Sequence, residues 1–212
     1  MLLLIGTAFV QFGVLPLSTA APEPKLADVR EAVVGVGAYP EGGTGVVVAK
    51  KGDEFYILTN KHVIDRSKKD RWLWCIHNRK RYTPIYIAED PRADLALLKA
   101  PISGAYVLPI ASRPTKVGEF ITQYGRQTGP ATAKITGETV YRDFPAVINY
   151  DCFTVTGDSG GPLVNSSGEL VGLHCEAQMY VEGGVMVYKP NSARAVRLEE
   201  IRAFVDRELK TP

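Results

Sequence analysis

The chain has 212 residues, of which 45% are hydrophobic and 23% charged, and its formal net charge is +2. This composition is that of a globular protein with one sizeable domain or two small ones, and it excludes a disordered or repetitive chain. So small a net charge gives no reason to expect a nucleic acid or a membrane surface as a partner. The locally basic residues 66–81 are interpreted as a solvated loop.

An uncharged apolar run opens the chain, from Leu2 to Leu17, and small residues follow it up to Ala21. This pattern predicts a secretory signal peptide over residues 1–20, cleaved after Ala20 or Ala21, and hence a secreted or periplasmic protein without stable membrane association. No positive residue precedes the run, so an uncleaved membrane anchor is the competing interpretation. The run is shorter than the roughly 20 apolar residues that span a bilayer, which favours export.

Three cysteines, Cys75, Cys152 and Cys175, are too few and too widely spaced to match a zinc site. Because their number is odd, at least one thiol is predicted to be free. Pairing of Cys152 with Cys175 stays open, since export would permit disulfides.

Short β-branched runs separated by turn residues follow the leader, and helical periodicity is absent from the first third of the chain. The first group of expected strands covers residues 33–37, 45–49, 55–59, 85–88 and 95–98. The second group covers residues 120–124, 133–136, 139–141, 146–148, 153–155, 170–174 and 184–188. Turn signals about every ten residues are typical of an all-β fold.

A polar, proline-bearing segment at residues 109–116 separates the two groups of strands. We therefore expect a leader and an N-terminal β-barrel at residues 21–112, and a C-terminal β-barrel with a terminal helix at residues 113–212. Ser192 is predicted to cap that helix, which would pack on the second barrel. Its expected apolar face consists of Val196, Ile201, Phe204, Val205 and Leu209.

Residues 156–162 read Thr-Gly-Asp-Ser-Gly-Gly-Pro and place Ser159 between residues that bend the backbone tightly. A serine hydroxyl is a poor nucleophile, so chemistry at this position needs a base and donors for an oxyanion. Gly157 has no Cβ, so its N–H can turn beside that of Ser159 and form an oxyanion hole with it. The alternative is a glycine-rich turn in which the serine is incidental.

The sequence Gly-Asp-Ser-Gly-Gly-Pro resembles the nucleophile motif of the chymotrypsin-like serine proteases, whose triad has the chain order His, Asp, Ser. His62 follows an apolar strand, a threonine and a small polar pair, and Asp94 directly precedes an apolar run, as in that family. His77 has no such context, and Asp90 is the alternative carboxylate. The resemblance implies two antiparallel six-stranded β-barrels, closed by a C-terminal α-helix.

It further implies a serine endopeptidase that acts on a protein or peptide substrate without a metal or cofactor. His62 would be the base, Asp94 the orienting carboxylate and Ser159 the nucleophile. The second barrel is most similar to protease domains of the Deg (HtrA) group, but the peptide-binding PDZ domain of that group has no counterpart here. A catalytically silent peptide-binding relative is the alternative, although such relatives usually lack a triad residue or an oxyanion glycine.

The residues around the nucleophile carry the expectation for substrate specificity. Phe153 stands where trypsin-like enzymes hold an aspartate, which argues against Lys or Arg at the P1 position of the substrate. Thr154 and His174 stand where glutamyl endopeptidases place the Thr and His that bind a P1 carboxylate. The resemblance thus implies Glu at P1, with Cys175 and Glu176 as further substrate-binding residues. The alternative is a pocket for small apolar residues, with His174 merely packing within the barrel.

Overall fold

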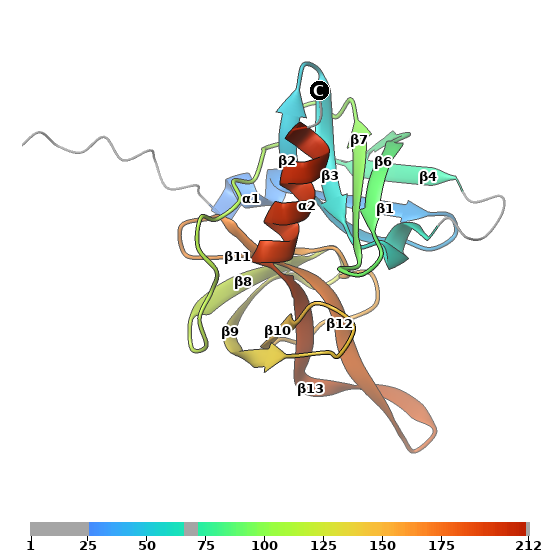
Figure 1. The fold of residues 1–212 in the computed structure, drawn as a ribbon. Helices are drawn as coiled ribbons and strands as arrows, with labels where there is room; N and C mark the ends of the chain where they lie inside the picture. Colours follow the sequence, from blue (N-terminus) through green and yellow to red (C-terminus); the bar gives the residue numbers. More distant parts are fainter. Residues whose placement is uncertain (1–25, 66–71, 211–212) are drawn as a thin grey trace, which may run out of the picture.

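The computed structural model describes residues 26–65 and 72–210, which form two β-sheet units with a helix at their junction (Figure 1). The predicted signal peptide at residues 1–20 lies outside the described residues. Within the described part of the chain, neither helix has the length and apolar character needed to cross a membrane.

The first unit is an antiparallel sheet of seven strands in the order β5-β4-β1-β2-β3-β7-β6. These strands are β1 (Val33–Ala38), β2 (Gly43–Lys51), β3 (Glu54–Thr59), β4 (Leu73–His77), β5 (Lys80–Tyr82), β6 (Ile85–Asp90) and β7 (Leu95–Ala100). All five predicted strands are present, together with β4 and β5, which the sequence did not indicate. The sheet stays open where six strands in a closed barrel were expected, because the short and mostly exposed β5 ends it without pairing with β6.

The second unit is a closed barrel of six strands in the order β10-β13-β12-β11-β8-β9. Its strands are β8 (Phe120–Gly125), β9 (Gly129–Thr139), β10 (Val147–Tyr150), β11 (Pro162–Val164), β12 (Leu170–Glu182) and β13 (Val185–Arg197). The six-stranded barrel predicted for this half is therefore confirmed. Strands β12 and β13 form a long hairpin that projects away from the barrel (Figure 1).

Residues 153–155 were expected to be a strand, and this expectation is wrong. The segment is irregular because Asp158 bends it into a turn: the N–H of Asp158 donates to the carbonyl of Val155 at 3.1 Å. The N–H of Val155 in turn donates to Oδ2 of Asp158 at 3.1 Å.

The terminal helix begins later than predicted, because Ser192 belongs to β13 and caps no helix. The Ser192 hydroxyl accepts a hydrogen bond from the N–H of Gln178 on β12, and so links the two strands of the hairpin. Ala193 and Ala195 are both buried, at the spacing of a strand with one face in the barrel. The helix α2 covers Leu198–Lys210.

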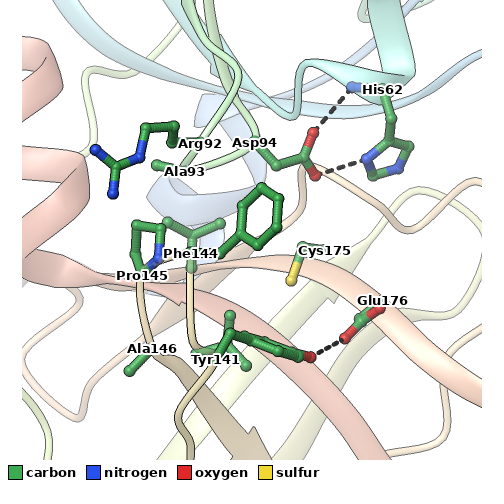
Figure 2. Close-up of a pocket in the computed structure, with 12 residues that line it drawn as sticks. His62, Arg92, Ala93, Asp94, Tyr141, Phe144, Pro145, Ala146, Cys175 and Glu176 are labelled. Atoms are coloured by element: carbon green, nitrogen blue, oxygen red, sulfur yellow. Dashed lines mark hydrogen bonds and ion pairs between the residues drawn. The ribbon is translucent and has the colours of Figure 1, made fainter.

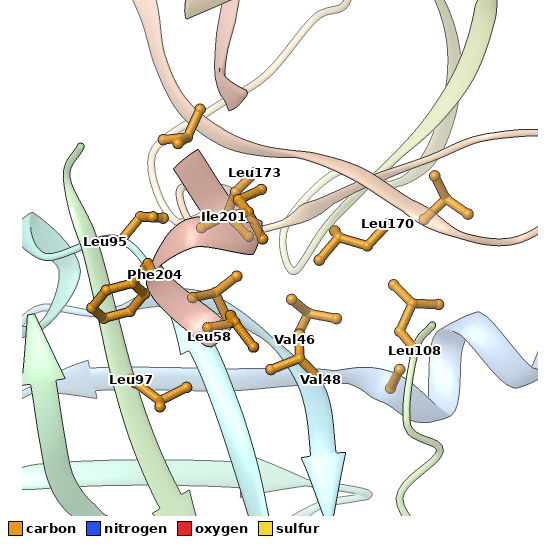
Figure 3. Close-up of a cluster of buried hydrophobic side chains, with 14 of the residues drawn as sticks. Val46, Val48, Leu58, Leu95, Leu97, Leu108, Leu170, Leu173, Ile201 and Phe204 are labelled. Atoms are coloured by element: carbon orange, nitrogen blue, oxygen red, sulfur yellow. The ribbon is translucent and has the colours of Figure 1, made fainter. Parts of the chain in front are cut away.

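Helix α2 packs on the second barrel, as predicted, and on the N-terminal sheet as well. Figure 3 shows Ile201 and Phe204 of α2 within a cluster of apolar side chains that both sheets supply. The N-terminal sheet contributes Val46, Val48, Leu58, Leu95 and Leu97. The C-terminal barrel contributes Tyr124, Val164, Leu170, Leu173 and Val196. This common core fixes the two units against each other.

A short helix, α1 (Leu26–Ala32), precedes the first strand, at a place where no helix was predicted. Val29 and Ala32 bury one face of it. Seven residues with two buried positions are too few for a periodic signal, so the helix escaped prediction.

Candidate active site

His62 lies at the start of a single 3₁₀ turn, His62–Ile64, just after β3 ends at Thr59. Val63 and Ile64 are buried and anchor this turn in the N-terminal sheet. The imidazole itself is about half exposed, so it faces the cleft between the two units.

Asp94 orients His62 through two contacts at once. Its Oδ1 accepts the backbone N–H of His62 at 3.0 Å, and its Oδ2 lies 2.7 Å from Nδ1 of the same residue (Figure 2). Asp94 has a φ of 54°, a left-handed conformation in which aspartate is enriched. The carboxylate can therefore hold the ring in one orientation and leave Nε2 for the cleft.

The alternative carboxylate, Asp90, has a different task. Its Oδ1 accepts the N–H groups of Arg92 at 3.1 Å and Ala93 at 3.2 Å, which closes the turn between β6 and β7. The structure thus pairs His62 with Asp94 and leaves Asp90 in a turn, as the spacing to the apolar run suggested.

The segment around Ser159 presents two backbone donors. Gly157 has a φ of 102° and Gly160 a φ of 84°, conformations that few other residues adopt. In the part of the chain that the structure describes, the N–H groups of Gly157 and Ser159 donate to no protein acceptor. These donors are therefore available to an oxyanion.

The Ser159 hydroxyl donates a long hydrogen bond, 3.5 Å, to the carbonyl of Cys175. The hydrogen bonds of the described residues do not include one between Ser159 and His62. Such a bond often forms with good geometry only when a substrate is present.

Asp158 stabilises the nucleophile segment, residues 156–160, through hydrogen bonds of its side chain. Its side chain is fully buried, and its Oδ1 accepts the N–H groups of Gln127 at 2.9 Å and Thr128 at 3.2 Å. With the Val155 N–H on Oδ2, three backbone amides of the same barrel satisfy this carboxylate. A Cβ on Gly125 would stand 2.2 Å from Oδ1, so this approach requires glycine.

A cavity of about 520 Å³ adjoins the His62–Asp94 pair. Figure 2 shows this pair at one wall, with Tyr141 and Glu176 at the opposite wall and Phe144 and Pro145 beside them. Oε1 of Glu176 accepts hydrogen bonds from Tyr141 at 3.0 Å and Arg194 at 2.7 Å, so its charge is paired. Of the predicted substrate-binding residues, Cys175 and Glu176 line this cavity.

Thr154 and His174 are both buried in the C-terminal barrel, 1% and 2% exposed. The Thr154 hydroxyl has no hydrogen-bond partner in the described structure. His174 Nδ1 lies 2.7 Å from the hydroxyl of Tyr150 and 3.1 Å from the carbonyl of Arg194. Burial lowers the pKa of His174 to about 4, against the opposing charge of Asp158, so the ring is neutral at neutral pH.

The contacts of Tyr150 and Arg194 bear on which nitrogen of His174 carries the proton. The Tyr150 side chain is fully buried, and His174 Nδ1 is its hydrogen-bond partner. A proton on Nδ1 would be donated to the Arg194 carbonyl and would leave the phenolic hydrogen without an acceptor, whereas a proton on Nε2 lets the phenol donate to Nδ1. Because an unpaired hydroxyl is costly in a buried site, we infer the tautomer with the proton on Nε2.

Phe153 lies at the surface, 67% exposed, and its ring meets that of Tyr188 edge-on at 6.0 Å between centroids. The Tyr188 hydroxyl accepts the N–H of Thr156 at 2.8 Å, so the β12–β13 hairpin supports the residue that precedes Gly157. The sequence did not single out Tyr188 or Tyr150, because both act through contacts between distant positions.

All three cysteines lie in the described part of the chain and are free thiols. Burial raises the pKa of Cys75 to about 12 and raises the pKa values of Cys152 and Cys175 as well. A Cys152–Cys175 disulfide, left open by the sequence, is absent from this structure.

A family model described as a trypsin-like peptidase domain matches residues 43–173. The probable periplasmic serine endoprotease DegP-like of Marinomonas sp. (strain MWYL1) is 33% identical over 150 residues, which are 67% of this chain and 30% of that protein. The protein of the same name from Hahella chejuensis is 34% identical over 150 residues, again 67% and 30%. The chain thus spans less than a third of the length of these relatives.

Solved structures show the same fold at lower identity. The active form of the Rv3671c protease from M. tuberculosis matches with a TM-score of 0.70 and 20% identity, covering 96% of this chain and 94% of that one. The serine endoprotease from Yersinia pestis matches with a TM-score of 0.68 and 24% identity, covering 87% of this chain and 65% of that one.

Proposed function

The chain belongs to the trypsin-like peptidase family, and from this membership we propose that it is a serine endopeptidase with the triad His62, Asp94 and Ser159. The observation that carries the proposal is the two-point contact of Asp94 with His62, and the unengaged N–H groups of Gly157 and Ser159 support it. A structural ion pair alone would not need those donors.

In the proposed mechanism, Nε2 of His62 takes the Ser159 proton as the serine oxygen attacks a substrate carbonyl carbon. Asp94 stabilises the imidazolium that forms, and the N–H groups of Gly157 and Ser159 bind the oxyanion. The imidazolium then protonates the leaving amine, and water hydrolyses the acyl-enzyme by the same steps. Peptide and protein chains are the proposed substrates.

Replacement of Ser159 tests the assignment. Ser159→Ala should abolish peptidase activity and labelling by an organophosphonate probe, while the folded state persists. Ser167→Ala is the matched control, because Ser167 lies on an exposed turn of the same barrel. Substantial activity in Ser159→Ala would overturn the nucleophile assignment, and a wild-type protein that binds peptides without labelling would favour the silent peptide-binding alternative.

For the P1 position we propose glutamate, with Thr154 and His174 as the groups that bind its carboxylate. Two features support this. The buried Thr154 hydroxyl lacks a partner, and the Tyr150 contact leaves a donor on Nε2 of His174, which bonds to no described residue. A buried polar group without a partner is costly, and a substrate oxygen would satisfy it.

Both donors are neutral, since His174 has a pKa of about 4. Both can donate to an oxygen at the end of a side chain, and neither carries a negative charge that would pair with an ammonium or guanidinium group. A small apolar P1 residue, the alternative, would leave both donors without a partner. Phe153, which stands where trypsin-like enzymes hold an aspartate, is exposed and brings no negative charge to this site.

A peptide library analysed by mass spectrometry decides among P1 residues. Cleavage mainly after Glu supports the proposal, cleavage after Val or Ala contradicts it, and a preference for Gln would replace the carboxylate by a carboxamide. His174→Ala should reduce cleavage after Glu about tenfold to a hundredfold more than cleavage after apolar residues, because a hydrogen bond to a charged group contributes about 1.5–3 kcal/mol.

We propose that the protein works outside the cytoplasm, as a secreted or periplasmic enzyme. The apolar segment at residues 2–17 and the periplasmic description of the relatives support this. N-terminal sequencing of exported protein should find Ala21 or Pro22 first. An intact Met1 in a membrane fraction would instead indicate an anchored protease.

A further inference from the structure

Thr44 is the second residue of β2 in the N-terminal sheet, yet its contacts reach the nucleophile segment of the C-terminal barrel. Its side chain is fully buried. Its N–H donates to the carbonyl of Ser159 at 2.8 Å, and its hydroxyl donates to the carbonyl of Gly157 at 2.8 Å. One residue thus holds the carbonyls of both residues whose N–H groups are the proposed oxyanion donors.

The hydroxyl of Thr44 is fixed in direction by its other contacts. Its oxygen accepts the N–H of Arg126 at 3.0 Å, so its single hydrogen is left for Gly157. The carbonyl of Thr44 accepts the hydroxyl of Thr59 at 2.7 Å, which ties the residue to β3. A hydroxyl that donates once and accepts once in a buried site has little freedom to turn.

The backbone segments around this contact are closely packed. A Cβ on Gly160 would lie 2.0 Å from the Thr44 carbonyl oxygen, and a Cβ on Gly43 would lie 2.6 Å from the Ser159 carbonyl oxygen. Gly157 has no side chain and a φ of 102°, so its backbone can rotate easily. The hydrogen bond from the Thr44 hydroxyl to the Gly157 carbonyl opposes this rotation.

We propose that Thr44 is a positioning residue that sets the geometry of the oxyanion hole across the junction between the two units. The inference rests on the proposed function, because it assigns a role to Thr44 in that same site. Loss of its hydroxyl releases the Gly157 carbonyl and the Arg126 N–H, and it leaves the contacts of Ser159, His62 and Asp94 in place. The oxyanion donors then point less accurately at the developing charge, and misplacement by about 1 Å can cost a hundredfold in rate.

The kinetic test compares three variants of the full chain. Thr44→Val removes the hydroxyl at constant shape, and kcat should fall about tenfold to a hundredfold while KM stays within about threefold. Thr44→Ser keeps the hydroxyl and should restore most of kcat. Thr139→Val is the matched control, because the Thr139 hydroxyl donates to Asn149 at 3.0 Å and bonds neither Thr44 nor residues 156–160, and it should leave kcat unchanged.

Inhibitor binding separates positioning from a general loss of structure. A peptide aldehyde forms a hemiacetal whose oxygen lies in the oxyanion hole, whereas the peptide alcohol of the same sequence has no carbonyl and forms no such oxygen. Thr44→Val should weaken binding of the aldehyde about tenfold or more and leave binding of the alcohol unchanged. Equal weakening of both ligands, or an unchanged kcat in Thr44→Val, would overturn the inference.

Amide hydrogen exchange gives a readout that needs no activity. Exchange at residues 156–160 should accelerate in Thr44→Val and return in Thr44→Ser, while Thr139→Val changes it little. Unchanged exchange in Thr44→Val contradicts the positioning role. A wild type without peptidase activity would refute the proposed function alone, since the exchange comparison would still decide on Thr44.

Discussion

His174 couples the stability of the fold to pH. Burial lowers its pKa to about 4, whereas a histidine in an unfolded chain titrates near 6.5. Between these values the unfolded chain binds a proton that the folded chain does not, so the free energy of unfolding rises with pH. The contribution is complete above about pH 6.5 and is lost as the pH falls to about 4, by about 3 kcal/mol in all.

Urea unfolding between pH 4.5 and 7 measures this dependence. In His174→Gln the free energy of unfolding should rise less steeply with pH than in the wild type. The difference in slope should correspond to at most one proton bound on unfolding. Parallel curves for the two proteins would mean that other groups carry the dependence.

Tyr150 should control selectivity through His174 without contacting the substrate. Tyr150→Phe removes the phenol that donates to Nδ1, so Nδ1 can take the proton and donate to the Arg194 carbonyl. Nε2 then loses its hydrogen, and kcat/KM for Glu substrates should fall about tenfold while apolar substrates change little. Paired fluorogenic peptides that differ only at P1 measure this ratio, and an equal fall for both would contradict the role.

Among single residues, the sequence indicates those that lie in local motifs. It does not indicate those whose role depends on contacts between distant positions of the chain. His62, Asp94 and Ser159 each adjoin an apolar strand or a glycine turn, so short stretches of sequence point to them. The Tyr150–His174 contact spans 24 positions and the Thr44–Gly157 contact spans 113. No local pattern records such pairs, because strand pairing in three dimensions creates them.

Helix α2 is expected to stabilise both units because its apolar face lies in their common core. Phe204 is buried there, and Phe204→Ala should reduce the free energy of unfolding by about 3–5 kcal/mol. Asp206→Ala on the exposed face removes an ion pair with Lys210 and should cost less than about 0.5 kcal/mol. Equal losses in the two variants would show that the core contact of α2 contributes little.

Element boundaries were harder to predict than element types. Strands rich in β-branched residues were found in both units, because alternation with turn residues is a local signal. The start of α2 was misplaced because apolar residues at Val196 and Ile201 suit a helix, whereas Ala193 and Ala195 bury one face of β13. Closure of a sheet is not local either, and the open N-terminal sheet could not be inferred from strand patterns.

For the whole molecule, the common core predicts a single cooperative unfolding transition. Both tryptophans, Trp72 and Trp74, lie in the N-terminal unit, so their fluorescence reports on that half. Amide hydrogen-exchange protection in β8 and β9 reports on the other half. The two signals should be lost at the same urea concentration, and transitions that differ clearly would indicate independent units.

The segment that connects the two units determines how the protein would respond to cleavage by a protease. Arg113 and Val117 are exposed on this segment, whereas Leu108 upstream is buried in the common core. The Arg202 guanidinium of α2 also holds the carbonyl of Ser112 at 2.9 Å. A cut between residues 113 and 117 would therefore yield two chains that stay associated, with His62 and Asp94 on one and Ser159 on the other. Denaturing gels would reveal the nick, while native size and catalysis would persist.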